Sequence, residues 1–311
     1  MSHFSVMVFG KNIEEQLAPY EESTKDKRFI AFVDEEDDYR KQYETESTTR
    51  VVMPDGRLLL PWDDAFKKPG AIGVGSDTHG VPANLEKREV PYKETYAAFE
   101  AFMDDWCGYE QRDPEKGRYG RWTNVNAKWD WYQIGGRWEG FFTLKRGRVP
   151  ANQAKKEDID VEAMCAEAEK KAREQYQKVA ALYPDGIIPK IKVWAEYLAE
   201  VDAKTITIDD ARKAYHDQDA VKACDEAKIL GFFGSLCDYQ VSEDEYAQLA
   251  RASAIVPFAV VKDGKWYEKG DMGWWGMVSG EKKQSDWNAE VMELFEATPD
   301  EELITIVDCH I

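Results

Sequence analysis

The two ends of the chain carry side chains that could act together in acid–base or metal chemistry. His3 lies in the opening stretch HFSV, and Asp308 and His310 lie in the closing stretch VDCHI. On a strand, Asp308 and His310 project to one face while Cys309 points to the other, because successive side chains alternate. Imidazole and carboxylate groups share protons or hold metal ions. We therefore take His3, Asp308 and His310 as candidate catalytic residues, with histidines hydrogen-bonded to the backbone as the alternative.

No complete catalytic motif surrounds these histidines. HFSV matches the His-hydrophobic-Ser-hydrophobic motif of two-histidine phosphoesterases, but a second copy is missing. The glycine-rich stretch GVGSDTHG lacks the Gly-Lys-Ser/Thr of a phosphate-binding P-loop. The motifs of serine hydrolases, kinases and His-Glu-x-x-His metalloproteases are also missing. The sequence consequently leaves the metal ion, the cofactor and the substrate undetermined.

The stretch WDWYQIGGRW, residues 129–138, is a candidate ligand-binding surface. If it forms a strand, Trp129 and Trp131 share one face, and Asp130 and Tyr132 share the other. Tryptophan rings offer a large flat surface to a ligand, although they pack most often into a hydrophobic core. Both interpretations are open from the sequence alone.

Glycines and charged residues complete this candidate surface. Gly135 and Gly136 permit a bulge or a close backbone approach, and the guanidinium of Arg137 can bind a carboxylate or a phosphate. A second aromatic stretch, YEKGDMGWWG, follows a predicted hairpin strand, and the two stretches either line one cleft or share one core. The candidate ligand-binding residues are Trp129, Trp131, Tyr132, Gly135, Gly136, Arg137, Asp271, Trp274 and Trp275.

The charge and the cysteines exclude several classes of function. The chain has 60 acidic and 41 basic residues and a formal net charge of −19, which opposes direct binding to nucleic-acid phosphates. The acidic run DEEDD at 34–38 is typical of a solvated face, and it would also suit docking on a basic groove of a partner protein. The five cysteines are scattered without a Cys-x-x-Cys pair, so neither a disulfide framework nor a zinc ribbon is expected.

Signals for membranes and export are missing as well. No run of about 18 apolar residues occurs, which is the length that a membrane-spanning helix needs. The opening stretch MSHFSVMVFG lacks the basic start and the small-residue cleavage site of a secretory signal. We expect a cytoplasmic protein with no membrane partner.

The elements at the two ends predict how the candidate catalytic residues meet. A buried strand and a short helix open the chain, and a hairpin with its turn at Asp263-Gly264, a helix and a last strand close it. This pattern predicts an α+β fold with a ferredoxin-like antiparallel sheet formed by both chain ends. The last strand would lie antiparallel to the first, with His3 close to His310.

The intervening sequence predicts one insertion. Residues 1–150 and 251–311 are expected to form the α+β core domain, and residues 151–250, with apolar residues at helical spacing, a helical insertion or subdomain. Within the core domain, the apolar stripe of residues 92–106 predicts one helix packed against a sheet. A turn at Asp55-Gly56 predicts a second hairpin.

Five blocks of the sequence resemble those of a known group of proteins. The blocks MSHFSVMVFG with EEQLAPY, KWDWYQIGGRW, MGWWG and VDCHI are similar to a family of uncharacterised proteins encoded by bacteriophages and bacterial genomes. The resemblance covers both ends and residues 128–138, but not the helical middle. It assigns no catalytic role to any residue. It implies a viral or mobile-element setting, where small acidic proteins that block host defence complexes are common.

Two hypotheses of function follow. In the first, the chain binds and inhibits a host protein complex, such as one that handles nucleic acid, as its charge and its lack of a complete catalytic motif suggest. In the second, it is a hydrolase or a nucleotide-modifying enzyme that uses His3, Asp308 and His310, with Arg137 holding an anion. The sequence narrowly favours the first hypothesis, because the charge is certain whereas the histidine site depends on an inferred topology. A homo-oligomer is compatible with both.

Overall fold

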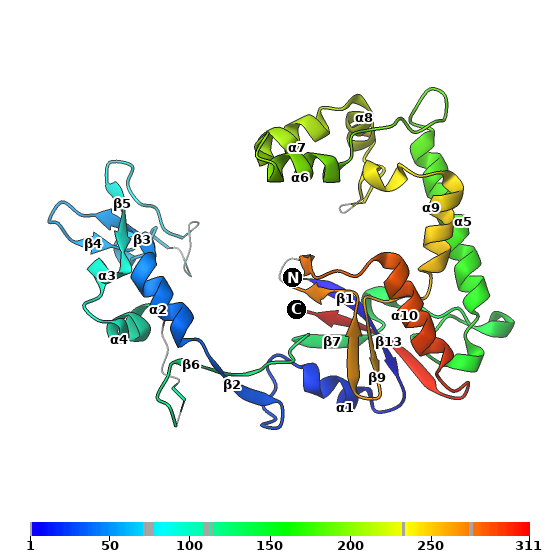
Figure 1. The fold of residues 1–311 in the computed structure, drawn as a ribbon, viewed down its shortest axis with the longest axis horizontal. Coiled ribbons are helices and arrows are strands. Elements are labelled where there is room, and N and C mark those ends of the chain that lie inside the picture. The colour runs from blue at the N-terminus through cyan, green and yellow to red at the C-terminus, as the bar shows by residue number, and fades with distance from the viewer. Residues whose placement is uncertain are drawn as a thin grey trace. The chain divides into compact units, whose positions relative to one another are not determined.

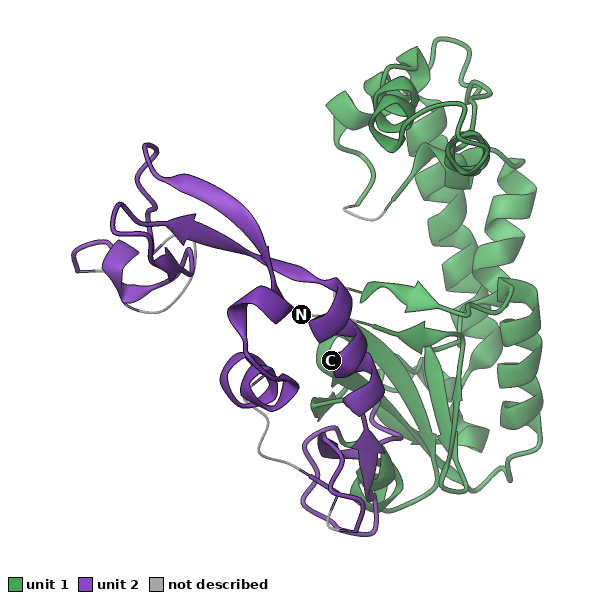
Figure 2. Cartoon of the chain, turned by 60° about the vertical axis from the view of Figure 1, so that its left-hand side comes forward, with its two compact units in different colours: residues 1–21, 128–311 green, residues 22–127 purple. Residues whose placement is uncertain are grey.

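The chain divides into two compact units. The computed structural model describes residues 2–70, 72, 78–107, 112–113, 115–231, 234–273 and 276–311. The first unit combines Met1–Glu21 with Lys128–Ile311, and the second unit is Glu22–Ala127 (Figure 2). The helical stretch that the sequence predicts over residues 151–250 therefore lies within the first unit.

The first unit is built on a six-stranded sheet that joins both ends of the chain. The strands are β1 His3–Phe9, β7 Trp131–Ile134, β8 Gln153–Lys155, β9 Ala259–Lys262, β10 Lys265–Glu268 and β13 Leu303–His310. Their order is β10-β9-β1-β13-β7, and β8 also pairs with β13. β1 and β13 are antiparallel neighbours, which places the two chain ends side by side (Figure 1). The predicted α+β fold with a sheet formed by both ends is confirmed.

The ferredoxin-like strand order is not confirmed. In a ferredoxin-like sheet the neighbouring strands are antiparallel, and the second strand of the hairpin lies next to the first strand of the chain. Here the first hairpin strand, β9, takes that place and runs parallel to β1. The hairpin turn itself is as predicted, because Asp263 and Gly264 both have positive φ, as a two-residue Asp-Gly turn requires.

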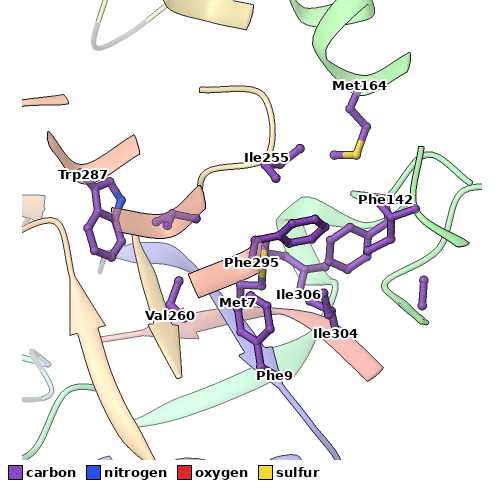
Figure 3. Close-up of a cluster of buried hydrophobic side chains, with 13 residues drawn as sticks. Met7, Phe9, Phe142, Met164, Ile255, Val260, Trp287, Phe295, Ile304 and Ile306 are labelled. Carbon is purple, nitrogen blue, oxygen red and sulfur yellow. The ribbon is translucent and has the colours of Figure 1, made fainter. Parts of the chain in front are cut away.

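Both faces of this sheet are covered by apolar side chains, which explains why β1 and β13 are almost wholly buried. Helix α10, Gln284–Glu296, packs on one face, where Figure 3 shows the side chains gathered between helix and sheet. That cluster comprises Met7, Phe9, Phe142, Ala154, Ile159, Met164, Ile255, Val260, Trp287, Val291, Phe295, Ile304 and Ile306. On the other face, Leu17 of the short helix α1, Ile13–Leu17, joins Phe4, Val6, Val8, Trp129, Ala259, Val261, Val307 and Cys309.

The remaining α-helices of the first unit pack mainly around another apolar cluster, although Met164 joins the cluster under α10. They are α5 Val161–Ala180, α6 Trp194–Asp202, α7 Ile208–His216, α8 Asp219–Ala227 and α9 Glu243–Ala252. Helices α5 and α9 lie side by side (Figure 1). A capping box between Ser242 and Glu245 starts α9, because each residue's side chain satisfies a backbone N–H of the other. The short strands β11 Asp271–Met272 and β12 Val278–Ser279 pair with each other.

The second unit combines two small sheets with short helices. Its strands are β2 Ile30–Asp34, β3 Ser47–Val52, β4 Leu58–Leu59, β5 Glu86–Pro91 and β6 Gly120–Asn124, and its helices are α2 Glu36–Thr45, α3 Tyr92–Thr95 and α4 Phe99–Phe102. β2 pairs with β6, and the other sheet has the order β4-β3-β5. The predicted hairpin at Asp55-Gly56 is confirmed by the pairing of β3 with β4.

The single helix predicted over residues 92–106 is wrong. The backbone of Tyr96 is extended and ends α3, and α4 begins only at Phe99 and continues as a π-helical turn, Met103–Cys107. The carbonyl of Tyr96 accepts a hydrogen bond from the hydroxyl of Tyr43, so the interruption is held by α2. These aromatic side chains pack on one another and on tyrosines of α2.

No helix in the described part of the chain has the length and apolar character needed to cross a bilayer.

We expect truncation of a methionine in the sheet core to destabilise the protein far more than truncation of an exposed methionine. Met7 is 0% exposed in the cluster under α10, whereas Met277 is 68% exposed. Met7→Ala should lower the free energy of unfolding by about 2–5 kcal/mol, because it leaves a cavity as well as removing apolar contacts. Met277→Ala, the matched control, should change it by no more than about 0.5 kcal/mol. Urea unfolding monitored by circular dichroism measures both. Equal effects would contradict the assigned core.

Candidate active site at the paired chain ends

The register of β1 and β13 places the two terminal histidines opposite each other. His3 pairs with His310, and their ring centroids are 5.1 Å apart at an angle of 76°. Opposed residues of an antiparallel pair point to the same face of the sheet. The same face is apolar further along the strands, at Met7 and Ile306, and becomes polar only at this end. The predicted proximity of His3 and His310 is confirmed.

A buried carboxylate orients His3. His3 Nδ1 lies 2.8 Å from Asp308 Oδ1, and Asp308 is only 2% exposed. A carboxylate only accepts hydrogen bonds, so the imidazole donates from Nδ1. The backbone N–H of Arg137 donates to the other oxygen, Asp308 Oδ2, at 3.0 Å. These two donors compensate for the cost of burying the carboxylate, which is large when a charge has no partner.

A second carboxylate orients His310 in the same way. His310 Nδ1 lies 2.6 Å from Asp130 Oδ1, and the histidine is 5% exposed. The indole of Trp131 stacks on the imidazole, with centroids 5.3 Å apart and planes 17° from parallel. Trp131 also meets the ring of His3 edge-on at 5.4 Å. The site therefore contains two His–Asp pairs with one tryptophan against both imidazoles.

The second nitrogen of each ring, Nε2, is not bound by these carboxylates. When Nδ1 donates to a carboxylate, a neutral imidazole keeps a lone pair on Nε2. Nε2 of His310 is buried and has no hydrogen-bond partner among the described residues. Over those same residues, no group of three or more His, Cys, Asp or Glu side chains is placed to hold a metal ion. The pairs are suited to accepting and donating protons.

Gly135 and Gly136 allow close approach to neighbouring polar side chains. Both have positive φ, which glycine adopts without strain. A Cβ on Gly136 would lie 2.5 Å from Oδ2 of Asp308, and a Cβ on Gly135 would lie 2.3 Å from the side-chain nitrogen of Asn152. Gly136 thus lets the chain turn closely around Asp308, so that the next backbone N–H reaches the carboxylate. In the structure, the close approach expected of these glycines is to protein side chains.

The predicted alternation in the 129–138 stretch is wrong before residue 131. Strand β7 begins at Trp131, so the regular alternation does not extend to the two preceding residues. Trp129 is buried in the cluster with Leu17 and donates from Nε1 to the Leu17 carbonyl, and its ring meets Tyr132 at 5.1 Å. Trp129 and Tyr132 belong to the core on the opposite face.

Asp130 belongs to this candidate site, although the sequence did not single it out. Its backbone N–H donates to the carbonyl of His310 at 2.9 Å, which fixes its position against the end of β13. From there its side chain reaches the histidine face. An acidic residue beside an aromatic strand was the only signal in the sequence, and alternation placed it on the wrong face.

The second aromatic stretch contributes three candidate residues, and the structure describes only Asp271 among them. Asp271 pairs with the ammonium of Lys128 at 2.9 Å, and Glu268 binds the same ammonium at 2.7 Å. Burial disfavours the charged form of Lys128, but these two carboxylates outweigh that effect and raise its pKa. Trp274 and Trp275 lie outside the described residues, so the proposed meeting of the two tryptophan clusters is not tested.

Arg137 and Cys309 differ in accessibility. The guanidinium of Arg137 is exposed and forms no ion pair with a described residue. Cys309 packs on the opposite face, as the alternation predicts, and is fully buried. Burial raises the pKa of its thiol, and the neighbouring Asp308 adds to that effect. Cys309 is therefore a core residue, whereas Arg137 can meet a ligand.

The chain matches no protein-family model, no curated protein sequence and no solved structure. The chemistry of the site is consequently inferred from its geometry.

The fit around Asp308 predicts different effects for two glycine substitutions. Gly147 has a positive φ of 63°, and a Cβ added there would meet no atom within 4 Å, so Gly147→Ala should cost only the backbone strain, about 1–2 kcal/mol. Gly136→Ala should cost at least about 1 kcal/mol more, because its Cβ displaces the Asp308 carboxylate. Urea unfolding measures the difference, and the nuclear magnetic resonance signals of the His3 ring should shift only in Gly136→Ala. Unchanged His3 signals in that variant would contradict the described contact.

Proposed function

We propose that the chain is an enzyme that acts on a phosphate-bearing substrate, as a hydrolase or a nucleotide-modifying enzyme, with His3 and His310 as the acid–base pair. The observation that carries this proposal is the pair of His–Asp contacts, 2.8 Å and 2.6 Å long, on imidazoles whose centroids are 5.1 Å apart. Each ring is held through Nδ1, so both present Nε2 for proton transfer.

Hydrolysis of a phosphoester would use the two histidines in opposite protonation states. One neutral imidazole accepts a proton from the attacking water as the new P–O bond forms. The other, as imidazolium, donates a proton to the leaving oxygen as the old P–O bond breaks. Asp308 and Asp130 act as positioning residues, because they hold the rings and stabilise the positive charge on the one that is protonated.

Two neighbouring side chains favour a nucleotide. The backbone of Arg137 adjoins the site through Asp308, and its exposed guanidinium forms no ion pair with a described residue. Guanidinium groups bind phosphates well. Trp131 is 43% exposed while its ring rests on His310, so it keeps apolar surface available to a base. Stacking of a nucleobase on tryptophan is a common mode of recognition.

Substitution of the two histidines tests this function. Purified wild-type protein is incubated with mononucleotides, dinucleotides and cyclic nucleotides, and the products are followed by chromatography. His3→Ala and His310→Ala should each lower kcat by about 10²- to 10⁴-fold, the range typical of a lost general acid or base. Asp130→Asn should also lower kcat, because an amide no longer fixes the required tautomer.

The matched control is a histidine–aspartate pair on the surface. His216 lies 3.0 Å from Asp225, and its side chain is 62% exposed. His216→Ala should retain full activity. Circular dichroism confirms that each variant is folded. Wild-type protein that converts none of these nucleotides, or histidine variants with undiminished rates, would refute the proposed enzyme.

A second candidate function is inhibition of a host protein complex by binding. The net charge of −19 favours it, since an acidic surface can compete for a basic groove. The resemblance to phage-encoded proteins supports this setting and a cytoplasmic location. The run at 34–38 contributes less free charge than its sequence suggests, because Arg118 pairs with Asp34 and Asp37 and Arg40 pairs with Glu36. We therefore place this function second.

The binding function predicts a salt-sensitive complex that does not depend on the histidines. Pull-downs from host lysate at low salt should recover a protein complex, and its amount should fall as salt screens the charges. His3→Ala with His310→Ala should recover the same complex. If no complex is recovered, or if the histidine variants lose it, this second function is wrong.

A further inference from the structure

The second unit contains a buried arginine that forms no ion pair with a described residue. Arg50 lies on β3 and is 8% exposed. Its Nε and Nη2 atoms are buried and have no hydrogen-bond partner among the described residues. Arginine keeps its positive charge in proteins, so it cannot escape the cost of burial by losing a proton. A buried charge without a partner is unfavourable, and such groups are normally paired.

Two neutral groups among the described residues contact the Arg50 side chain. Its guanidinium carbon lies 5.9 Å from the centre of the Trp106 ring. The hydroxyl of Tyr96 hydrogen-bonds to Arg50 and also to Asp105. Arg50 itself forms no ion pair with any residue that the structure describes. An aromatic ring and a hydroxyl offset only part of the free-energy cost of burying the guanidinium charge. An anion would therefore be bound favourably here.

A second arginine lies directly opposite Arg50 on the neighbouring strand β5. The register of β3 and β5 pairs Arg50 with Arg88. Directly opposed residues of an antiparallel pair share a face, and like charges in that position destabilise the sheet. Arg88 is exposed and, over the described part of the chain, has no ion pair. An anion between the two guanidinium groups would remove this repulsion, because it attracts both of them.

The unsatisfied atoms define the chemistry of that anion. Nε and Nη2 carry two parallel N–H bonds along one edge of the guanidinium, and this edge binds two oxygens of a carboxylate or a phosphate at once. We propose that Arg50 and Arg88 form an oxyanion-binding site on the β4-β3-β5 sheet, with the buried edge of Arg50 as its bidentate donor and the exposed Arg88 at its entrance. The site lies in the second unit and shares no residue with the histidine site, so it stands whether or not the proposed enzyme function is correct.

Calorimetric titration of the full chain with inorganic phosphate tests the site. At constant ionic strength, wild-type protein should bind phosphate saturably, Arg50→Met should lose this binding, and Arg88→Met should weaken it at least tenfold. Arg50→Lys should also weaken it, because lysine keeps the charge but lacks the two-donor edge. Arg57→Met is the matched control, since Arg57 is exposed and already paired with Asp55, and it should bind as wild type does.

A second titration with acetate identifies which oxyanion is preferred. If either anion binds and Arg50→Met abolishes that binding, the site is supported and the preferred anion identifies its class of ligand. Thermal unfolding in chloride checks folding, and Arg50→Met should unfold at the same temperature as wild type or higher, because it removes an unpaired buried charge. The proposal is overturned if wild type binds neither anion, or if Arg50→Met or Arg50→Lys binds as tightly as wild type.

Discussion

The pairing of β1 with β13 is the constraint on which the histidine site depends. It joins residues as far apart in the chain as His3 and Asp308, which are separated by 305 positions. Side-chain packing specifies its register, because a slip of one residue would move every side chain of a strand to the opposite face. Such a slip would place the two histidines on different sides of the sheet. The hydrophobic core thus fixes the geometry of a polar site.

The sheet face that carries the histidines is apolar under α10 and polar at the end of the strands. Under α10 it is filled by Met7, Ile304 and Ile306, whereas its end carries the two histidines and Asp308. Burying these polar groups is tolerated because each has a defined partner: a carboxylate for each imidazole, and a backbone N–H for Asp308. The exception is Nε2 of His310. In a network that is otherwise satisfied, that buried atom is left without a partner among the described residues.

Two unpaired groups of cations in this acidic chain stand out by their position. Many arginines form ion pairs with the abundant carboxylates, as Arg118, Arg173 and Arg251 do. Arg137 beside the histidine pair and Arg50 with Arg88 in the second unit remain unpaired within the described residues. Exposed arginines elsewhere, such as Arg112 and Arg146, also lack an ion pair among the described residues, so position singles these out: Arg137 adjoins the histidine site, and Arg50 is buried. Both proposals of an anionic ligand start from these positions.

Local patterns in the sequence determined the framework of the first unit. Apolar runs predicted the terminal strands, Asp263-Gly264 predicted the hairpin turn, and their order predicted that His3 and His310 meet. Turn chemistry and side-chain periodicity are local properties, so a single sequence contains them. The same information failed for residues 92–106, where contacts with α2 interrupt a stretch that has helical periodicity. It also gave no sign that residues 22–127 form a unit of their own.

Only the tertiary structure decided which groups complete each site. Asp130 reaches His310 because β7 begins one residue later, and Gly136 is needed because Asp308 lies against it. Arg50 and Arg88 face each other because of the register between β3 and β5. These relations depend on strand boundaries and on register between distant segments, which the packing of the whole unit sets. The sequence by itself determined which chemical groups were available, and the fold determined which of them meet.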